Sequence, residues 1–152
     1  MTLGFTFIPD PRASGPRRGR GLGLIGRFQK GKKAMRLLIA DGDQRYRRSI
    51  RRFLEMDADV KVVAEAADGK GTVSLCERLK PQVILMDLDL PRFGGLEVIR
   101  TLKAEFPLMR VVMVCRVADE ACRKVAFKCG ADAFLSKTEE MSRLLSTIHQ
   151  SP

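Results

Sequence analysis

Asp87 is the most prominent candidate for a reactive residue in this sequence, because it directly follows a run of four apolar residues at 83–86. An unbroken apolar run of this length is typical of a strand buried on both faces in the middle of a parallel sheet. Open α/β sheets bind their ligands at the carboxyl ends of such strands. A carboxylate at position 87 is therefore well placed for chemistry, and Pro91 with Gly94 and Gly95 then turns the chain towards a new helix.

Other apolar runs also end on residues that carry charge or can react. Asp41 and Asp43 follow the run at 37–40. Cys115 ends the run at 110–115, and Lys137 follows the run at 131–135. Carboxylates gathered at one edge repel each other unless a cation intervenes, and oxygen ligands of this kind suit Mg²⁺. Carboxylate, Mg²⁺ and lysine together are the parts needed to transfer a phosphoryl group onto an aspartate. The alternative is that the two early aspartates only cap a helix and that Lys137 is a surface residue.

The segments that must position these residues alternate between strand and helix. Strands are predicted at 37–40, 60–66, 83–86, 110–115 and 131–135, and helices at 43–56, 69–79, 96–103, 118–129 and 139–149. This alternation implies an α/β fold, a doubly wound five-stranded parallel sheet with helices on both faces. Five such units fit the flavodoxin-like strand order 2-1-3-4-5, which brings four strand ends to one rim. The second strand alternates in polarity, so we expect it at an edge of the sheet.

The positive charge of the chain is concentrated at its beginning. The 152 residues carry a formal net charge of +10, of which residues 1–34 contribute +7 and the remainder +3. Residues 1–34 are rich in glycine, proline and arginine, and we expect a disordered basic extension there, upstream of a natural start at Met35. Residues 35–150 form the predicted folded domain. Its mild charge gives no reason to expect specific nucleic-acid binding.

Two further features of composition narrow the class of protein. No apolar run approaches the roughly 20 residues of a membrane span, so no membrane association is expected. The four cysteines form no CxxC pair and only one histidine accompanies them, which favours reduced thiols over zinc or disulfides. Reduced thiols in a chain without an export signal predict a cytoplasmic location.

At this point the residues match a known family. Residues 36–149 resemble the receiver domain of bacterial two-component response regulators, the CheY-like superfamily. The sequence is most similar to the sequences of receivers that usually carry a helix-turn-helix output domain. The matching segments are 38–41, 84–91 with 95–97, and 130–137.

The resemblance implies a role for each candidate residue. Asp87 would be the phosphoacceptor, receiving a phosphoryl group from a histidine kinase or a phosphotransfer protein, and Lys137 would contact that group. Asp41, Asp87 and the backbone of Asp89 would hold Mg²⁺. Phe134 matches the aromatic residue that responds to phosphorylation in the family. A receiver of this kind is phosphorylated once and is not a turnover enzyme.

Three positions depart from the family pattern. Gly42 stands where the family has a second consecutive acid, the one that touches the metal, so weaker Mg²⁺ binding is expected; Asp43, one residue later, could partly substitute. Cys115 stands where the family has threonine or serine, and a thiol is a weaker hydrogen-bond donor to a phosphoryl group and to the switch. Arg116 replaces a residue that is usually small, and it would either crowd the phosphate or supply a charge to it.

These departures leave more than one function open. The first is a phosphorylated receiver that signals by a conformational or docking change, and the second is a degenerate pseudo-receiver that binds a partner without phosphorylation. A remote alternative is a phosphatase of the haloacid-dehalogenase type, with Asp87 as nucleophile and Asp89 as acid. That family places its DxD motif on the first strand, whereas two strands precede it here.

The output of the domain is not evident from the sequence, because no helix-turn-helix follows before Pro152. In receivers, the fourth helix, fifth strand and fifth helix form the face usually used for partners. We therefore expect a homodimer or an effector contact there. The candidate exposed residues are Arg116, Arg123, Lys124, Lys128 and Arg143.

Overall fold

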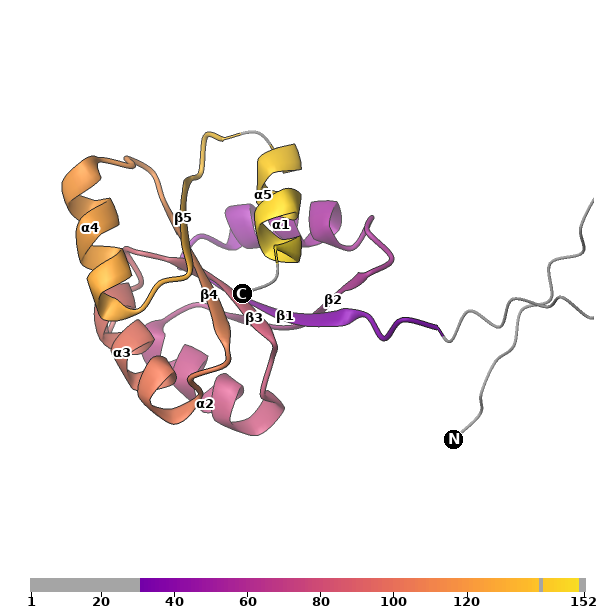
Figure 1. The fold of residues 1–152 in the computed structure, drawn as a ribbon, viewed down its shortest axis with the longest axis horizontal. Helices are drawn as coiled ribbons and strands as arrows, with labels where there is room; N and C mark the ends of the chain where they lie inside the picture. The colour runs from indigo at the N-terminus through magenta and orange to yellow at the C-terminus, as the bar shows by residue number, and fades with distance from the viewer. Residues whose placement is uncertain (1–30, 140, 151–152) are drawn as a thin grey trace, which may run out of the picture. The chain divides into compact units, whose positions relative to one another are not determined.

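The computed structural model describes residues 31–139 and 141–150, which form five strands and five helices in strict alternation (Figure 1). In chain order the elements are β1 (Met35–Ala40), α1 (Gln44–Leu54), β2 (Val60–Ala66), α2 (Gly69–Leu79), β3 (Val83–Asp87), α3 (Gly95–Glu105), β4 (Arg110–Cys115), α4 (Glu120–Cys129), β5 (Ala133–Ser136) and α5 (Met141–His149). The predicted extension at 1–34 falls almost entirely on residues 1–30, outside the described residues.

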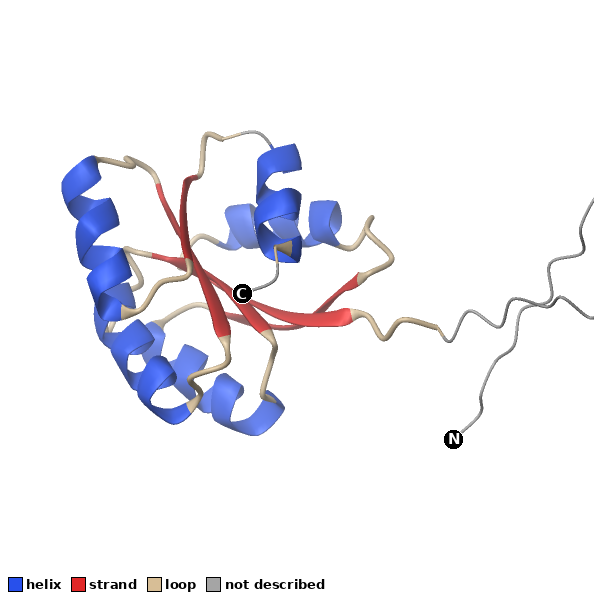
Figure 2. Cartoon of the chain, in the orientation of Figure 1, coloured by secondary structure: helices blue, strands red, loops and turns tan. Residues whose placement is uncertain are grey.

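The strands form one parallel sheet in the order β2-β1-β3-β4-β5. Strand β3 lies at its centre, pairing with β1 through Leu37↔Val83 and with β4 through Val83↔Arg110. The helices lie on both sides of this sheet (Figure 2). The predicted flavodoxin-like fold and strand order are confirmed, and β2 is an edge strand, as its alternating polarity indicated.

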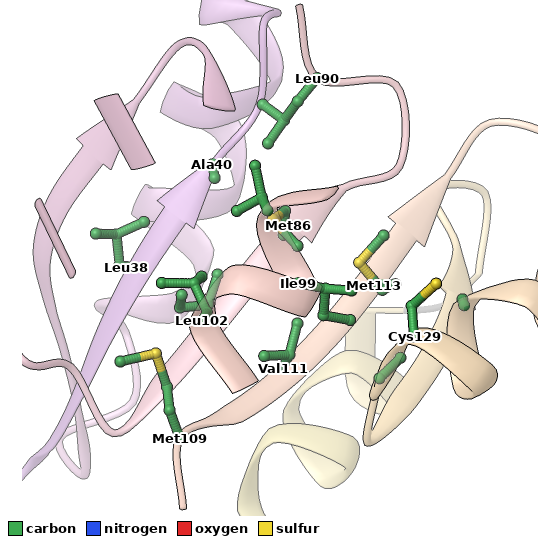
Figure 3. Packing of buried hydrophobic residues seen from close by; sticks show 14 of the residues in the cluster. Leu38, Ala40, Met86, Leu90, Ile99, Leu102, Met109, Val111, Met113 and Cys129 are labelled. Atoms are coloured by element: carbon green, nitrogen blue, oxygen red, sulfur yellow. The ribbon is translucent and has the colours of Figure 1, made fainter. Parts of the chain in front are cut away.

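Two separate cores explain why the central strands are apolar throughout. Residues such as Leu38 and Met86 point to one face and pack with Ile99 and Leu102 of α3, together with residues of α2 and α4 (Figure 3). Their neighbours in the strands point to the other face, where they meet α1 and α5. Because both faces are covered, β3 buries all five of its residues. This burial fixes the position of Asp87 at the end of the strand.

Aspartates set where three of the helices begin. The side chains of Asp43, Asp68 and Asp119 accept backbone hydrogen bonds at the starts of α1, α2 and α4. Helix α4 therefore begins at Glu120, two residues later than the sequence pattern predicted, because Asp119 caps it with extended backbone. At its other end Gly130 adopts φ 112°, a left-handed conformation that glycine tolerates best.

Candidate functional site

The carboxyl edge of the sheet brings together three of the predicted site residues. Asp87 ends β3, Asp41 directly follows β1 and Lys137 directly follows β5. The Lys137 Nζ atom lies 2.6 Å from Asp41 Oδ2 and 2.9 Å from Asp87 Oδ2. Only 2% of the Asp41 side chain is exposed, and 10% of each of the other two. One ammonium group thus bridges two largely buried carboxylates.

Lys137 is held from several sides. Its backbone N–H donates to the carbonyl of Cys115 at 2.8 Å, which ties the residue after β5 to the end of β4. Its Nζ atom also lies 4.4 Å from the centre of the Tyr46 ring, close enough for a cation–π interaction. Burial lowers the pKa of Lys137, but the contacts with Asp41 and Asp87 outweigh it and raise the pKa above its usual value. The side chain is therefore a cation at neutral pH.

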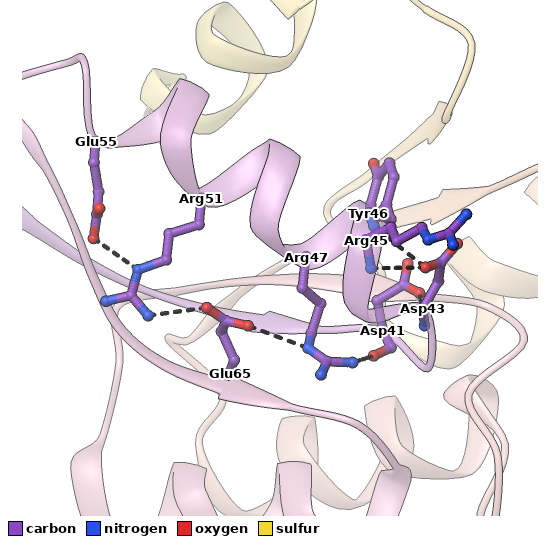
Figure 4. Close-up of polar contacts among 8 residues, drawn as sticks. All are labelled: Asp41, Asp43, Arg45, Tyr46, Arg47, Arg51, Glu55 and Glu65. Atoms are coloured by element: carbon purple, nitrogen blue, oxygen red, sulfur yellow. Dashed lines mark hydrogen bonds and ion pairs between the residues drawn. The ribbon is translucent and has the colours of Figure 1, made fainter.

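Asp41 is fixed by both its side chain and its backbone. Its Oδ1 accepts the Asp43 N–H at 2.8 Å, and its carbonyl accepts Arg47 Nη1 at 2.6 Å (Figure 4). Its buried Oδ2 forms an ion pair with Lys137 Nζ. Burial raises the pKa of Asp41, with hydrogen bonds from Lys137 and Asp43 acting in the opposite direction. This carboxylate is consequently held on one oxygen by a backbone N–H and on the other by the Lys137 ammonium.

A pair of arginines fixes helix α1, which begins beside Asp41. Arg47 and Arg51 of α1 both contact Glu65 of β2, at 3.2 and 2.9 Å, and Arg51 also pairs with Glu55 (Figure 4). Burial raises the pKa of Glu65, yet the two arginines lower it overall. The network links the start of α1, and with it Asp41, to the edge strand.

Asp43 acts as the N-cap of α1. Its Oδ1 accepts the backbone N–H groups of Arg45 at 2.9 Å and Tyr46 at 3.3 Å, and these bonds lower the pKa of Asp43. Of the two roles predicted from the sequence, the structure shows the cap. Gly42 beside it leaves little room, because a Cβ atom there would lie 3.2 Å from Pro91 Cδ.

An open pocket of about 410 Å³ lies over this edge of the sheet. The residues that line it are Asp41, Gly42, Asp43, Asp87, Asp89 and Arg116. Asp89 is exposed, and its backbone N–H donates to Asp87 Oδ1 at 3.1 Å. Asp87 therefore receives one hydrogen bond on each oxygen, from Asp89 and from Lys137, and faces space large enough for a phosphoryl donor.

The two residues expected to couple the site to the rest of the domain are both buried. Cys115 ends β4 with its Sγ 4.0 Å from the carbonyl of Leu135, and burial raises the pKa of its thiol. Phe134 of β5 is 3% exposed, and the guanidinium of Arg123 on α4 lies 5.5 Å from its ring centre. Arg123, one of the predicted surface residues, therefore covers the aromatic side chain.

Two carboxylates at this edge of the sheet have the chemistry to hold a magnesium ion. Within residues 31–139 and 141–150, no three His, Cys, Asp or Glu side chains are grouped to hold a metal. Asp41 and Asp87 nevertheless line one pocket, where their carboxylates share the single ammonium of Lys137. Mg²⁺ keeps several waters and is held by one or two carboxylates, so these two meet the minimum requirement.

Sequence reasoning missed the parts that hold Lys137 and Asp41 in place. Neither Tyr46 nor Arg47 was among the site residues predicted from the sequence. In the structure Tyr46 lies against Lys137 and Arg47 holds the Asp41 carbonyl. The available signal was position: both residues lie in the first turn of α1, which begins beside Asp41.

Comparison with known proteins decides the family. The model of the response regulator receiver domain matches residues 37–149, which is most of the chain. The chain belongs to the response regulator receiver family. Receivers of this family serve in two-component phosphorelays, generally bind Mg²⁺ and are generally not turnover enzymes. The remote phosphatase alternative is thus not supported. None of the helices in the described part of the chain has the length and hydropathy of a membrane span.

Several curated proteins are similar to this receiver. It is 31% identical to the transcriptional regulatory protein DegU of Brevibacillus brevis over 120 residues, covering 79% of this chain and 51% of DegU. It is 33% identical to the nitrate/nitrite response regulator protein NarL of Escherichia coli over 114 residues, covering 75% and 53%. The chain therefore spans about half the length of these relatives. It matches 97% of the chemotaxis protein CheY of Listeria monocytogenes at 29% identity.

Solved structures agree with the observed fold. The receiver domain of the putative response regulator NarL from Mycobacterium tuberculosis superposes with a TM-score of 0.70 at 25% identity, covering 78% of this chain and 99% of that one. A LuxR-family response regulator from Aurantimonas gives 0.73 at 28% identity, covering 76% and 83%. Both structures therefore share the fold described above.

Proposed function

We propose that this receiver accepts a phosphoryl group on Asp87 from the phosphohistidine of a histidine kinase or phosphotransfer protein. The observation that carries the proposal is the bridge between Lys137 and the two carboxylates. Because Lys137 already lies 2.9 Å from Asp87, it is in reach of a group attached there. Burial of all of β3 fixes the nucleophile relative to this cation, and positioning with charge neutralisation dominates phosphoryl transfer.

In the proposed step an Asp87 oxygen attacks phosphorus. A new O–P bond forms while the P–N bond of phosphohistidine breaks, and the imidazole nitrogen keeps that electron pair and takes up a proton. Lys137 donates to a phosphoryl oxygen, and Asp41 holds the ammonium in place from the opposite side. Asp41 and Asp87, with the backbone of Asp89, would hold Mg²⁺, which supplies further charge neutralisation when it is bound.

A change at Phe134 would carry the signal outwards. Its ring lies beneath Arg123 of α4, so a movement of β5 would displace Arg123 and the helix that carries it. Helix α4 also exposes apolar side chains, Val125 and Phe127, which suit a protein partner or a second copy of the chain. Since Cys115 is a poor hydrogen-bond donor, the coupling between phosphoryl group and switch is expected to be weak.

The second candidate function is a pseudo-receiver that binds its partner without phosphorylation. Two observations favour it: position 42 offers no carboxylate to a metal, and position 115 offers a thiol in place of a hydroxyl. The exposed apolar residues of α4 would serve this function equally well.

The test is incubation of the purified protein with Mg²⁺ and acetyl phosphate, read by intact mass. We expect the mass of one phosphoryl group to be added to the wild type and to Asp89→Asn, which changes an acid of the same pocket. Asp87→Asn should add none. Absence of any addition to the wild type at millimolar Mg²⁺ would exclude the phosphorylated receiver and leave the pseudo-receiver.

A further inference from the structure

Arg116 is a cation in the proposed site to which neither the fold nor the mechanism assigns a task. It directly follows β4, is exposed and lines the same pocket as Asp41 and Asp87. Among residues 31–139 and 141–150 no side chain forms a hydrogen bond or ion pair with its guanidinium, although four aspartates line that pocket. The guanidinium interacts electrostatically with Asp43, but no hydrogen bond from the described part of the chain holds it in place, so it is available to a new anion.

Phosphorylation of Asp87 would create such an anion, and the site has few groups to neutralise it. A phosphoryl group carries close to two negative charges at neutral pH. Lys137 is already shared with Asp41. Gly42 supplies no further carboxylate to retain Mg²⁺, and Cys115 supplies only a thiol. The residues that remain leave part of the added charge uncompensated.

We propose that Arg116 binds the phosphoryl group on Asp87 and takes over part of the charge neutralisation that a divalent cation would provide. A guanidinium suits this task because it is always charged and can donate two parallel hydrogen bonds to phosphate oxygens. The inference rests on the proposed function, phosphorylation of Asp87. Its consequence is that this receiver accepts a phosphoryl group at Mg²⁺ concentrations too low to load its metal site.

The rival role for Arg116 is an obstacle. An exposed arginine beside the pocket could slow the approach of a phosphoryl donor by its bulk, and its removal would then speed phosphorylation. Charge and bulk are separated by two variants. Arg116→Met keeps a long unbranched side chain and removes the charge, whereas Arg116→Lys keeps the charge and removes the paired donors. Arg48→Met, an exposed position of α1 that does not line the pocket, is the matched control.

The first readout is the rate of phosphorylation by acetyl phosphate across a Mg²⁺ series that begins in EDTA. We expect Arg116→Met to be at least tenfold slower than the wild type at the lowest Mg²⁺ concentrations, in line with the loss of one donor to a developing charge. The deficit should shrink as Mg²⁺ rises. The rate of Arg116→Lys should lie between those of the wild type and Arg116→Met. The rate of Arg48→Met should match that of the wild type at every Mg²⁺ concentration.

The second readout is Mg²⁺ binding without any phosphoryl donor. Tyr46 is the single tyrosine of a chain without tryptophan, and its ring lies 4.4 Å from Lys137 Nζ, so its fluorescence reports on this site. Removing a cation from the pocket should tighten Mg²⁺ binding in Arg116→Met. Tighter metal binding combined with slower phosphorylation at low Mg²⁺ is a pair of effects that neither an obstacle nor a surface residue produces.

The outcomes separate this proposal from the proposed function. A wild type that is never phosphorylated overturns both. A wild type that is phosphorylated, with Arg116→Met equal to it or faster at low Mg²⁺, overturns the role of Arg116 and leaves Asp87 as the acceptor.

Discussion

Removal of Lys137 should destabilise the domain far more than removal of an ordinary surface lysine. Its ammonium lies within 3 Å of Asp41 and Asp87, whose side chains are 2% and 10% exposed. Without it, two carboxylates would face each other with no cation between them. Breaking a buried ion pair by deleting one partner costs about 3–5 kcal/mol. Because the pocket is open to solvent, we expect Lys137→Ala to lose about 3 kcal/mol of unfolding free energy.

The measurement is urea unfolding at pH 7 and low salt in the presence of EDTA. With an m-value of about 1.5 kcal/mol per molar, this loss moves the urea midpoint down by about 2 M. Lys124→Ala, an exposed position on α4, should move it little. Replacing Asp87 by asparagine in the Lys137→Ala background should restore much of the loss, because one of the two opposed charges is then gone.

The same explanation predicts how the loss depends on pH. Because burial raises the pKa of Asp41, the folded state holds a proton there at pH values where the unfolded chain has lost it. Ionised Asp41 therefore opposes folding, and stability falls as pH rises from its unfolded pKa through its folded one. The penalty of Lys137→Ala should be largest at neutral pH and shrink in acid. A penalty within 1 kcal/mol of that for Lys124→Ala at pH 7 would refute the reasoning.

Three further predictions follow from individual contacts. Gly42→Asp should tighten Mg²⁺ binding by about 10–100-fold in the Tyr46 fluorescence titration; unchanged affinity would mean that Pro91, 3.2 Å from the new Cβ, excludes the side chain. Asp43→Ala should lower the urea midpoint by removing the α1 cap while leaving Mg²⁺ affinity as it was; weaker Mg²⁺ binding would make Asp43 a ligand. Asp57→Asn should lower the midpoint at pH 7 and match the wild type in acid, below both the unfolded and the folded pKa of Asp57. The contact with His149 lowers the pKa of Asp57, so its contribution is present above the unfolded pKa and disappears as pH falls through the folded one; an equal loss at both pH values would disprove this origin.

The strand ends could be predicted from the sequence because a buried parallel strand leaves a strong pattern. Strand β3 is apolar up to its last residue, Asp87, so the position and direction of the strand both follow from the sequence. The strand order also brings Asp41 and Lys137 to this same edge, although β3 and β4 lie between their strands. Topology carries this prediction, and no knowledge of side-chain orientation was needed.

The contacts within the site could not be predicted in the same way. Asp43 at the start of a helix is equally compatible with a cap and with a metal ligand, and only the positions of the Arg45 and Tyr46 N–H groups distinguish them. Tyr46 fits an apolar helix face equally well whether or not a lysine lies against its ring. Such contacts depend on how α1 and β5 pack across the sheet, which the local sequence pattern does not encode.

The three departures from the family pattern lie where they can alter the chemistry without altering the scaffold. The site edge is held by backbone bonds, such as Lys137 N–H to the Cys115 carbonyl and Leu88 N–H to the Val114 carbonyl, and these do not depend on the side chain at position 115. Gly42 and Arg116 are exposed residues that follow strand ends. The geometry of nucleophile and lysine is therefore preserved while the charge around them is redistributed, from an acid that retains a metal to a guanidinium that can bind the phosphoryl group directly.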